Sequence, residues 1–145
     1  MGEEEAIQVA RRHVEAFNAG DWGAYSADLT NETVHEEVAT NRRMTGIVEI
    51  LDLQKGWKAA FPDAKGSITD ALACGSTAVL EITYEGTHSG NLEMPGGAVP
   101  PTGRRASVKA VEVVETENGK IKAEREYFDL AGMMAQLGLG ARASA

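Results

Sequence analysis

The stretch TAVLEITYEGTH, residues 77–88, is the clearest β-strand in the sequence. Its even positions carry Ala78, Leu80, Ile82 and Tyr84, whereas its odd positions are mainly threonine and glutamate. Successive side chains of a strand point to opposite faces, so this alternation predicts one buried face and one exposed face. The even face must be the buried one, and His88 is its last residue.

Working outward from this strand, turn and capping signals divide the rest of the chain. Helices are expected over 3–18, 22–27, 46–61 and 130–139, and further strands over 33–38, 65–73, 107–115 and 120–128. Asn118-Gly119 is a strong hairpin signal between the last two strands. Helices followed by locally joined strands indicate an α+β fold with a mostly antiparallel sheet. The 145 residues fit one domain spanning 1–145.

The long connection between residues 89 and 103 joins two strands that two residues could have joined. It holds three of the four prolines and four glycines. Because connections of this length are often functional, we expect it to act as a lid.

Composition excludes several classes of partner. The formal net charge is −8, which argues against binding to nucleic acid or to anionic membranes. No apolar run approaches the roughly 20 residues that span a bilayer, and the N-terminus is acidic, unlike a secretory signal. A cytoplasmic protein is therefore expected.

The cysteine and histidine content predicts neither a disulfide nor a metal site. Cys74 is the single cysteine and has no basic neighbour, so we expect a buried structural thiol. The three histidines are scattered and show no metal-binding spacing. No metal and no cofactor is expected.

The last strand is expected to turn its odd positions inward, because its even positions 122, 124 and 126 are all charged. This places Arg125, Tyr127 and Asp129 in the interior. Asp129 also directly precedes a helix, where aspartate is a favoured N-cap, and the two interpretations are about equally good.

Together these patterns predict an apolar pocket with a few convergent polar groups, the usual form of a small-molecule site. Candidate lining or binding residues are His35, Trp57, Phe61, Tyr84, Glu112, Arg125 and Tyr127. Trp57 and Phe61 could instead be core, His35 could face water, and Arg125 could pair with Glu112 on the neighbouring strand for stability alone.

The candidate catalytic residues are Asp129 and His88. A carboxylate beside apolar walls has a raised pKa and can act as a general base, and an imidazole can hold the oxyanion of an enolate. These residue types suit proton abstraction next to a carbonyl. His88 could also be a buried histidine with its hydrogen bonds satisfied.

Several segments together carry a family resemblance. They are FPD at 61–63, GTHSG at 86–90, PPTGR at 100–104, NGKI at 118–121, YFDLAG at 127–132 and QLG at 136–138. In this order and spacing, the chain resembles the SnoaL-like polyketide cyclases over nearly its whole length.

The resemblance implies a cone of the nuclear-transport-factor-two-like type, with a strongly curved sheet wrapped around the N-terminal helices and an internal pocket. It implies a cofactor-independent cyclase of antibiotic biosynthesis that closes a ring of a polycyclic aromatic polyketide by intramolecular aldol condensation. Asp129 matches the family's general acid/base and His88 a substrate-binding histidine.

Two other functions stay open. One is an epoxide hydrolase, isomerase or hydroxylase-like enzyme on the same scaffold, in which Arg125, Asp129 and Glu112 would activate water. The other is a small-molecule binding protein without chemistry, which the apolar strand 107–115 favours. Outward valines at 111 and 113 predict a homodimer or homotetramer formed through the sheet.

Overall fold

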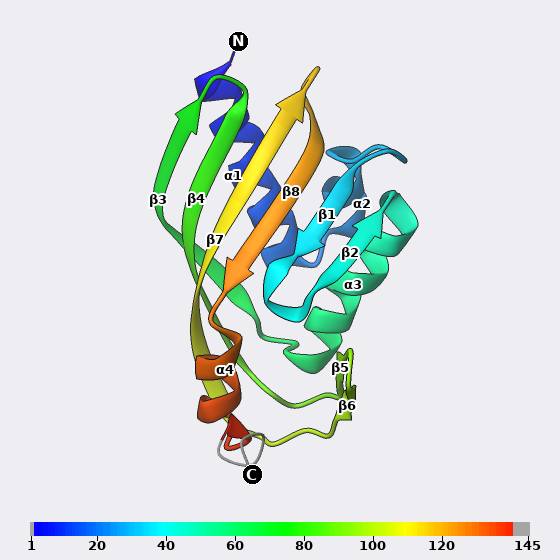
Figure 1. The fold of residues 1–145 in the computed structure, drawn as a ribbon, viewed down its shortest axis with the longest axis vertical. Coiled ribbons are helices and arrows are strands. Elements are labelled where there is room, and N and C mark those ends of the chain that lie inside the picture. Colours follow the sequence, from blue (N-terminus) through cyan, green and yellow to red (C-terminus); the bar gives the residue numbers. More distant parts are fainter. Residues whose placement is uncertain (1, 141–145) are drawn as a thin grey trace.

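The computed structural model describes residues 2–140, which form an α+β cone as predicted (Figure 1). The helices are α1 (Glu3–Ala19), α2 (Trp22–Ala27), α3 (Ile47–Ala60) and α4 (Leu130–Gln136), with a 3₁₀ turn η1 at Val38–Thr40. The strands are β1 (Val34–Glu37), β2 (Arg42–Thr45), β3 (Lys65–Cys74), β4 (Thr77–Thr87), β5 (Leu92–Met94), β6 (Gly97–Val99), β7 (Arg105–Glu117) and β8 (Lys120–Phe128).

Six strands make one curved, open sheet in the order β2-β1-β8-β7-β4-β3. All neighbours are antiparallel except β1 and β8, which run parallel. Helix α1 lies across one face of the sheet and contacts β3, β4 and β7, while α3 lies beside β2 (Figure 1). The helices and the curved sheet therefore enclose the interior between them.

The predicted buried face of β4 is confirmed. Ala78, Leu80 and Ile82 are at most 1% exposed, and they pack against the apolar stripe of α1, which includes Val9 and Val14. Burial of such aliphatic side chains contributes about 1.5–3 kcal/mol each, so this contact is a main source of stability.

The connection 89–103 contains a small hairpin, β5–β6, that the sequence pattern did not predict. The connection is docked on the rest of the molecule: Leu92 is buried, and the backbone N–H groups of Ser89 and Gly90 both donate to the carbonyl of Ala60. A Cβ at Gly90 would lie 2.0 Å from the carbonyl oxygen of Ala59, so only glycine fits this close approach.

One strand was not predicted, and one local prediction is wrong. Residues 42–45 form an edge strand, β2, whose sequence RRMT has no apolar alternation that would reveal it. Cys74 is exposed rather than buried, because it lies at the end of β3 beside the turn into β4. Among residues 2–140, no helix combines the length and apolarity needed to cross a bilayer.

The predicted facing of β8 is also wrong, and a β-bulge is the reason. Thr116 pairs with Ile121 but Glu115 pairs with Ala123, so Lys122 is an extra residue in β8. A bulge of this kind reverses the alternation beyond it. Ile121 therefore points inward as expected, whereas from residue 124 onward the even positions point inward.

Candidate functional site

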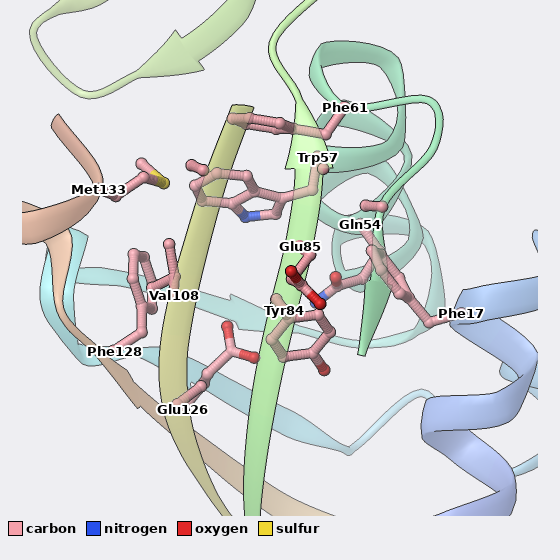
Figure 2. Close-up of a pocket in the computed structure, with 14 residues that line it drawn as sticks. Phe17, Gln54, Trp57, Phe61, Tyr84, Glu85, Val108, Glu126, Phe128 and Met133 are labelled. Atoms are coloured by element: carbon pink, nitrogen blue, oxygen red, sulfur yellow. The ribbon is translucent and has the colours of Figure 1, made fainter. Parts of the chain in front are cut away.

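A pocket opens between the concave face of the sheet and helix α3, with about 640 Å³ of empty space including its mouth. Five aromatic side chains form most of its wall: Phe17, Trp57, Phe61, Tyr84 and Phe128. Figure 2 shows the Glu126 carboxyl group and the Gln54 side chain among these rings. The pocket is thus a largely aromatic enclosure with very few polar groups.

Glu126 faces Glu112 directly across the β7–β8 pair. The two carboxyl groups interact closely enough that each affects the pKa of the other. The Tyr84 hydroxyl donates a hydrogen bond to Oε1 of Glu112, at 2.8 Å. Tyr84 thus holds Glu112, and Glu126 is the member of the pair that lines the pocket.

Electrostatics favours a shared proton on this pair. Burial, followed by the charge of and the hydrogen bond to Glu112, raises the pKa of Glu126 well above its ordinary value. Burial and the charge of Glu124 also raise the pKa of Glu112. Two facing carboxyl groups do not easily both ionise, so burial and their mutual repulsion favour a state in which the pair holds one proton.

A second buried pair lies beside the first on β1 and β8. His35 pairs in register with Glu124, and its Nδ1 lies 2.8 Å from Oε1 of that residue. Burial alone would raise the pKa of Glu124 and lower that of His35. The hydrogen bond and charge interaction between them outweigh burial, so the pKa of Glu124 is lowered and that of His35 raised. These directions describe an ion pair.

Glu37, which is fully buried, anchors a third network. Its Oε1 accepts from Arg42 Nη2 at 2.6 Å, and its Oε2 accepts from the indole N–H of Trp57 at 2.7 Å. Arg42 also donates to the backbone carbonyl of Glu93, in the β5–β6 hairpin. One buried carboxylate therefore fixes the plane of a pocket wall and links it to the docked connection.

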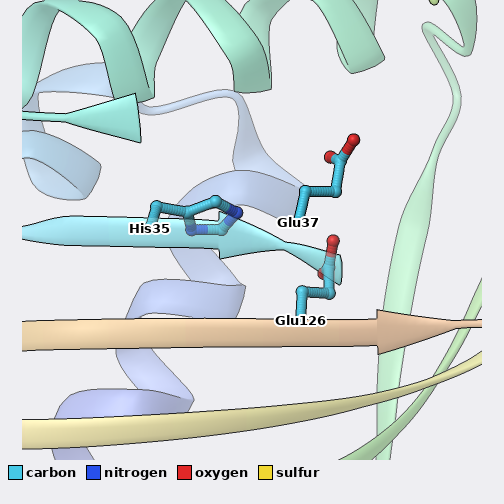
Figure 3. A group of neighbouring side chains, drawn as sticks. All are labelled: His35, Glu37 and Glu126. Carbon is cyan, nitrogen blue, oxygen red and sulfur yellow. The ribbon is translucent and has the colours of Figure 1, made fainter. Parts of the chain in front are cut away.

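His35, Glu37 and Glu126 are neighbours (Figure 3). One nitrogen or carboxylate oxygen from each lies within 4.8 Å of those of the other two. This spacing would allow the three to surround a small ion. Both oxygens of Glu37, however, already accept hydrogen bonds from Arg42 and Trp57, and the guanidinium supplies the positive charge there. We therefore interpret the group as part of the buried polar network.

A smaller cavity lies behind the pocket and shares Phe17, Gln54 and Tyr84 with it. Glu112 and Glu124 both line this cavity, and Oε2 of Glu124 is buried there without a hydrogen-bond partner. Buried polar atoms normally have partners, so this oxygen is available to a small polar molecule.

The structure brings five of the predicted site residues to the pocket or to the buried polar groups at its base. Trp57, Phe61 and Tyr84 line the wall, and Glu112 supports Glu126 from behind. His35 points inward and joins the base through Glu124.

His88 points inward but does not line the pocket. It is fully buried, stacks on Phe61 with ring centroids 5.3 Å apart, and its Nδ1 accepts from the backbone N–H of Thr102. Burial lowers its pKa. In this position His88 ties the end of β4 to the connection 89–103 and supports a pocket wall.

Arg125, Tyr127 and Asp129 do not face the interior, contrary to prediction. The bulge at Lys122 turns Arg125 to the outer face, where it pairs with Glu115 and not with Glu112. Tyr127 is 42% exposed. The exposed Asp129 accepts from the backbone N–H of Gly132 at 2.9 Å, which makes it the N-cap of α4.

This position predicts a purely structural role for Asp129. Its replacement by alanine should lower the free energy of unfolding by about 1 kcal/mol, the usual effect of losing an N-cap, and Asp129→Asn should cost less because asparagine also caps helices. Urea unfolding of the three proteins measures the difference. Equal stability of the alanine variant and the wild type would contradict the capping role.

The polar residues that the sequence analysis missed are Glu124, Glu126 and Gln54. The two glutamates were placed on the outer face because the bulge was not recognised. One signal pointed to it: Phe128, a large aromatic residue, belongs to the same alternating set. Gln54 lies on the helix face that contains Trp57 and Phe61, but a single amide gave no reason to select it.

Comparison with known proteins places this fold and pocket in a family. The sequence profile of the SnoaL-like polyketide cyclases matches residues 7–137. No curated protein sequence matches the chain significantly.

Solved structures agree with this match. AclR from Streptomyces galilaeus, a proposed hydroxylase, superimposes with a TM-score of 0.78 at 25% identity, covering 93% of this chain and 96% of AclR. TsrD from Streptomyces laurentii gives 0.78 at 26% identity, covering 94% and 96%. A proposed SnoaL-like polyketide cyclase from Jannaschia sp. CCS1 shares the fold, with a TM-score of 0.82 at 18% identity over 96% and 94% of the two chains.

The fold and pocket thus define a cone-shaped protein of the type that encloses small molecules. The chain belongs to the SnoaL-like polyketide cyclase family.

Proposed function

We propose that the protein is a cofactor-independent cyclase that closes a ring in a small hydrophobic polyketide by intramolecular aldol condensation, with the Glu112–Glu126 pair as general acid/base. The observation that carries this proposal is a pair of facing glutamates, Glu112 and Glu126, at the base of an aromatic-walled pocket. Family membership supports the cyclase type of reaction.

In the proposed reaction the ionised pair removes a proton from a carbon next to an ester or ketone. The resulting enolate carbon attacks a second carbonyl of the same molecule, a carbon–carbon bond forms, and the new alkoxide takes back a proton from the pair. The raised pKa of Glu126 suits both directions of this transfer near neutral pH.

The remaining pocket groups would orient and polarise the substrate. The Gln54 amide reaches the pocket and can donate to a carbonyl or enolate oxygen. The rings of Trp57 and Phe128 meet edge to face, with centroids 5.8 Å apart, and form a rigid corner for a planar molecule. Holding the two reacting ends together can supply several kcal/mol of the barrier.

The proposal is tested by incubating the protein with an aromatic polyketide that carries both an ester with an acidic α-carbon and a ketone. Ring closure is followed by mass spectrometry, and α-proton exchange in D₂O by NMR. We expect exchange and a product that has lost one water or kept the mass of the substrate. A compound that binds but is recovered with its α-proton unexchanged would identify a binding protein instead.

We also propose association through the outer face of the sheet. Val111 and Val113 alternate onto that face, next to the 42% exposed Tyr127. A partly apolar outer face favours a dimer or larger assembly. Sedimentation should show it at micromolar concentration, and a monomer throughout that range would contradict the proposal.

A further inference from the structure

The Glu112–Glu126 pair lacks the cationic partner that neighbouring buried carboxylates have. Salt bridges pair the others as follows: Asp28 with Arg12 at 2.7 Å, Glu37 with Arg42 at 2.6 Å, and Glu124 with His35 at 2.8 Å. Within residues 2–140, no lysine, arginine or histidine lies within 4.0 Å of either carboxyl group of the pair. The pair thus has a hydrogen bond from Tyr84 but no cation in salt-bridge contact to balance its charge.

The pocket that this pair borders has no basic side chain of its own. Its lining consists of aromatic and aliphatic residues, Gln54, Glu126 and Glu85. Glu85 belongs to the outward positions of β4 and lies beside Arg105, so Glu126 is the acidic side chain that reaches the interior. Any positive charge in the pocket must come from a ligand.

The aromatic wall favours such a ligand. The face of an aromatic ring is electronegative and attracts cations, most strongly where water is excluded. Two of the rings already attract cations of the chain: Arg42 Cζ lies 6.0 Å from the Trp57 ring and Lys58 Nζ 4.9 Å from the Phe17 ring. The rings of Phe61, Tyr84 and Phe128 have no such neighbour among the described residues.

We infer that the pocket binds an organic cation: a molecule with an apolar ring body and a protonated or quaternary amine that lies against the Glu112–Glu126 pair. The inference deepens the proposed function by naming the charge of the substrate. It rests on that function in assigning cation binding and ring closure to the same pocket. A buried charge without a partner is costly, and a ligand cation supplies the missing partner.

Binding of a cation would change the state of the pair. A positive charge beside Glu126 favours its ionised form, so the shared proton leaves to the buffer when the ligand enters. Both carboxyl groups are then ionised, so a larger fraction of Glu126 is free to accept a proton from the substrate. In this way the substrate's own charge would activate the residue that removes its proton.

Two phenols that differ only in charge test the inference: (4-hydroxyphenyl)trimethylammonium and its carbon isostere 4-tert-butylphenol. Titration calorimetry of the full chain at pH 7, in two buffers of different ionisation enthalpy, gives both affinity and proton release. We expect the cation to bind at least about ten-fold more tightly than the isostere, and to release a fraction of a proton that the isostere does not release.

Matched variants locate the effect. Glu126→Gln should reduce the preference for the cation to less than about three-fold and abolish the proton release. Glu81→Gln removes the same charge from the exposed outer face of β4 and should leave both unchanged. Circular dichroism checks that each variant is folded.

Equal affinity for the two phenols, tighter binding of the neutral one, or binding of neither would overturn the inference with the wild-type protein alone. An unchanged preference in Glu126→Gln would also overturn it. Neither affinity nor proton release depends on turnover, so a failed cyclisation assay would contradict the proposed function and leave cation binding standing. Conversely, cyclisation of a neutral substrate by a protein that shows no preference for the cation would support the proposed function and overturn this inference.

Discussion

Replacing Glu126 with glutamine should lower kcat by about 10²–10⁴-fold, the usual contribution of general acid/base catalysis. Glutamine keeps the size of the side chain and can still donate a hydrogen bond to Glu112, but it cannot accept or return a proton. Affinity for a neutral substrate should therefore change only a few-fold. Single-turnover rates and equilibrium binding on the same protein measure the two quantities separately.

The control for this experiment is Asp129→Asn, the change that the sequence alone would have selected. Asp129 caps α4 from the surface, so its variant should turn over within about two-fold of the wild type. If the Asp129 variant is inactive and the Glu126 variant is active, the assignment of the acid/base to the carboxyl pair is wrong.

The same Glu126→Gln substitution should stabilise the protein at neutral and alkaline pH. The folded-state pKa of Glu126 is raised, so the stability associated with its protonated form is fully present below the unfolded-state pKa and is lost as pH rises through the folded-state pKa. The variant has no such loss. We expect its advantage to be near zero below pH 4.5 and to grow steadily as the pH rises to 8.

Other ionisable groups surround Glu126 and are present in both proteins, and one of them, Glu112, is coupled to Glu126 and responds to its replacement. They are Glu124 on the same strand, His35 and Glu37 on β1, Arg42 on β2, Glu112 on β7 and Tyr84 on β4. Urea unfolding of wild type and variant between pH 4.5 and 8 isolates the Glu126 effect as a difference. Glu81→Gln controls for net charge, and a difference that does not grow with pH would refute the raised pKa.

The fold could be predicted from sequence because several independent signals agree. The alternation of residues 77–88 defines the buried face of β4, and Asn118-Gly119 forms the hairpin between β7 and β8 with positive φ angles at both residues. The inward position of Glu112 also follows from simple alternation along β7. Where each local signal is strong, the expected and observed elements coincide.

The polar base of the site could not be derived in the same way. Its residues depend on the parallel pairing of β1 with β8, which brings His35 and Glu37 beside Glu124 and Glu126 across more than eighty residues of sequence. No local pattern encodes that pairing. The bulge at Lys122 adds a second obstacle, since strict alternation across it selects the opposite set of side chains.

That single inserted residue also bears on which changes of length the pocket tolerates. Removing Lys122 would make the pairing of β7 with β8 regular, since Ile121 and Ala123 already face the consecutive residues Thr116 and Glu115, and it would leave the two acids on the pocket side. Relatives that lose this one position just after the NG turn would therefore be expected to keep the same charge at the floor of the aromatic chamber.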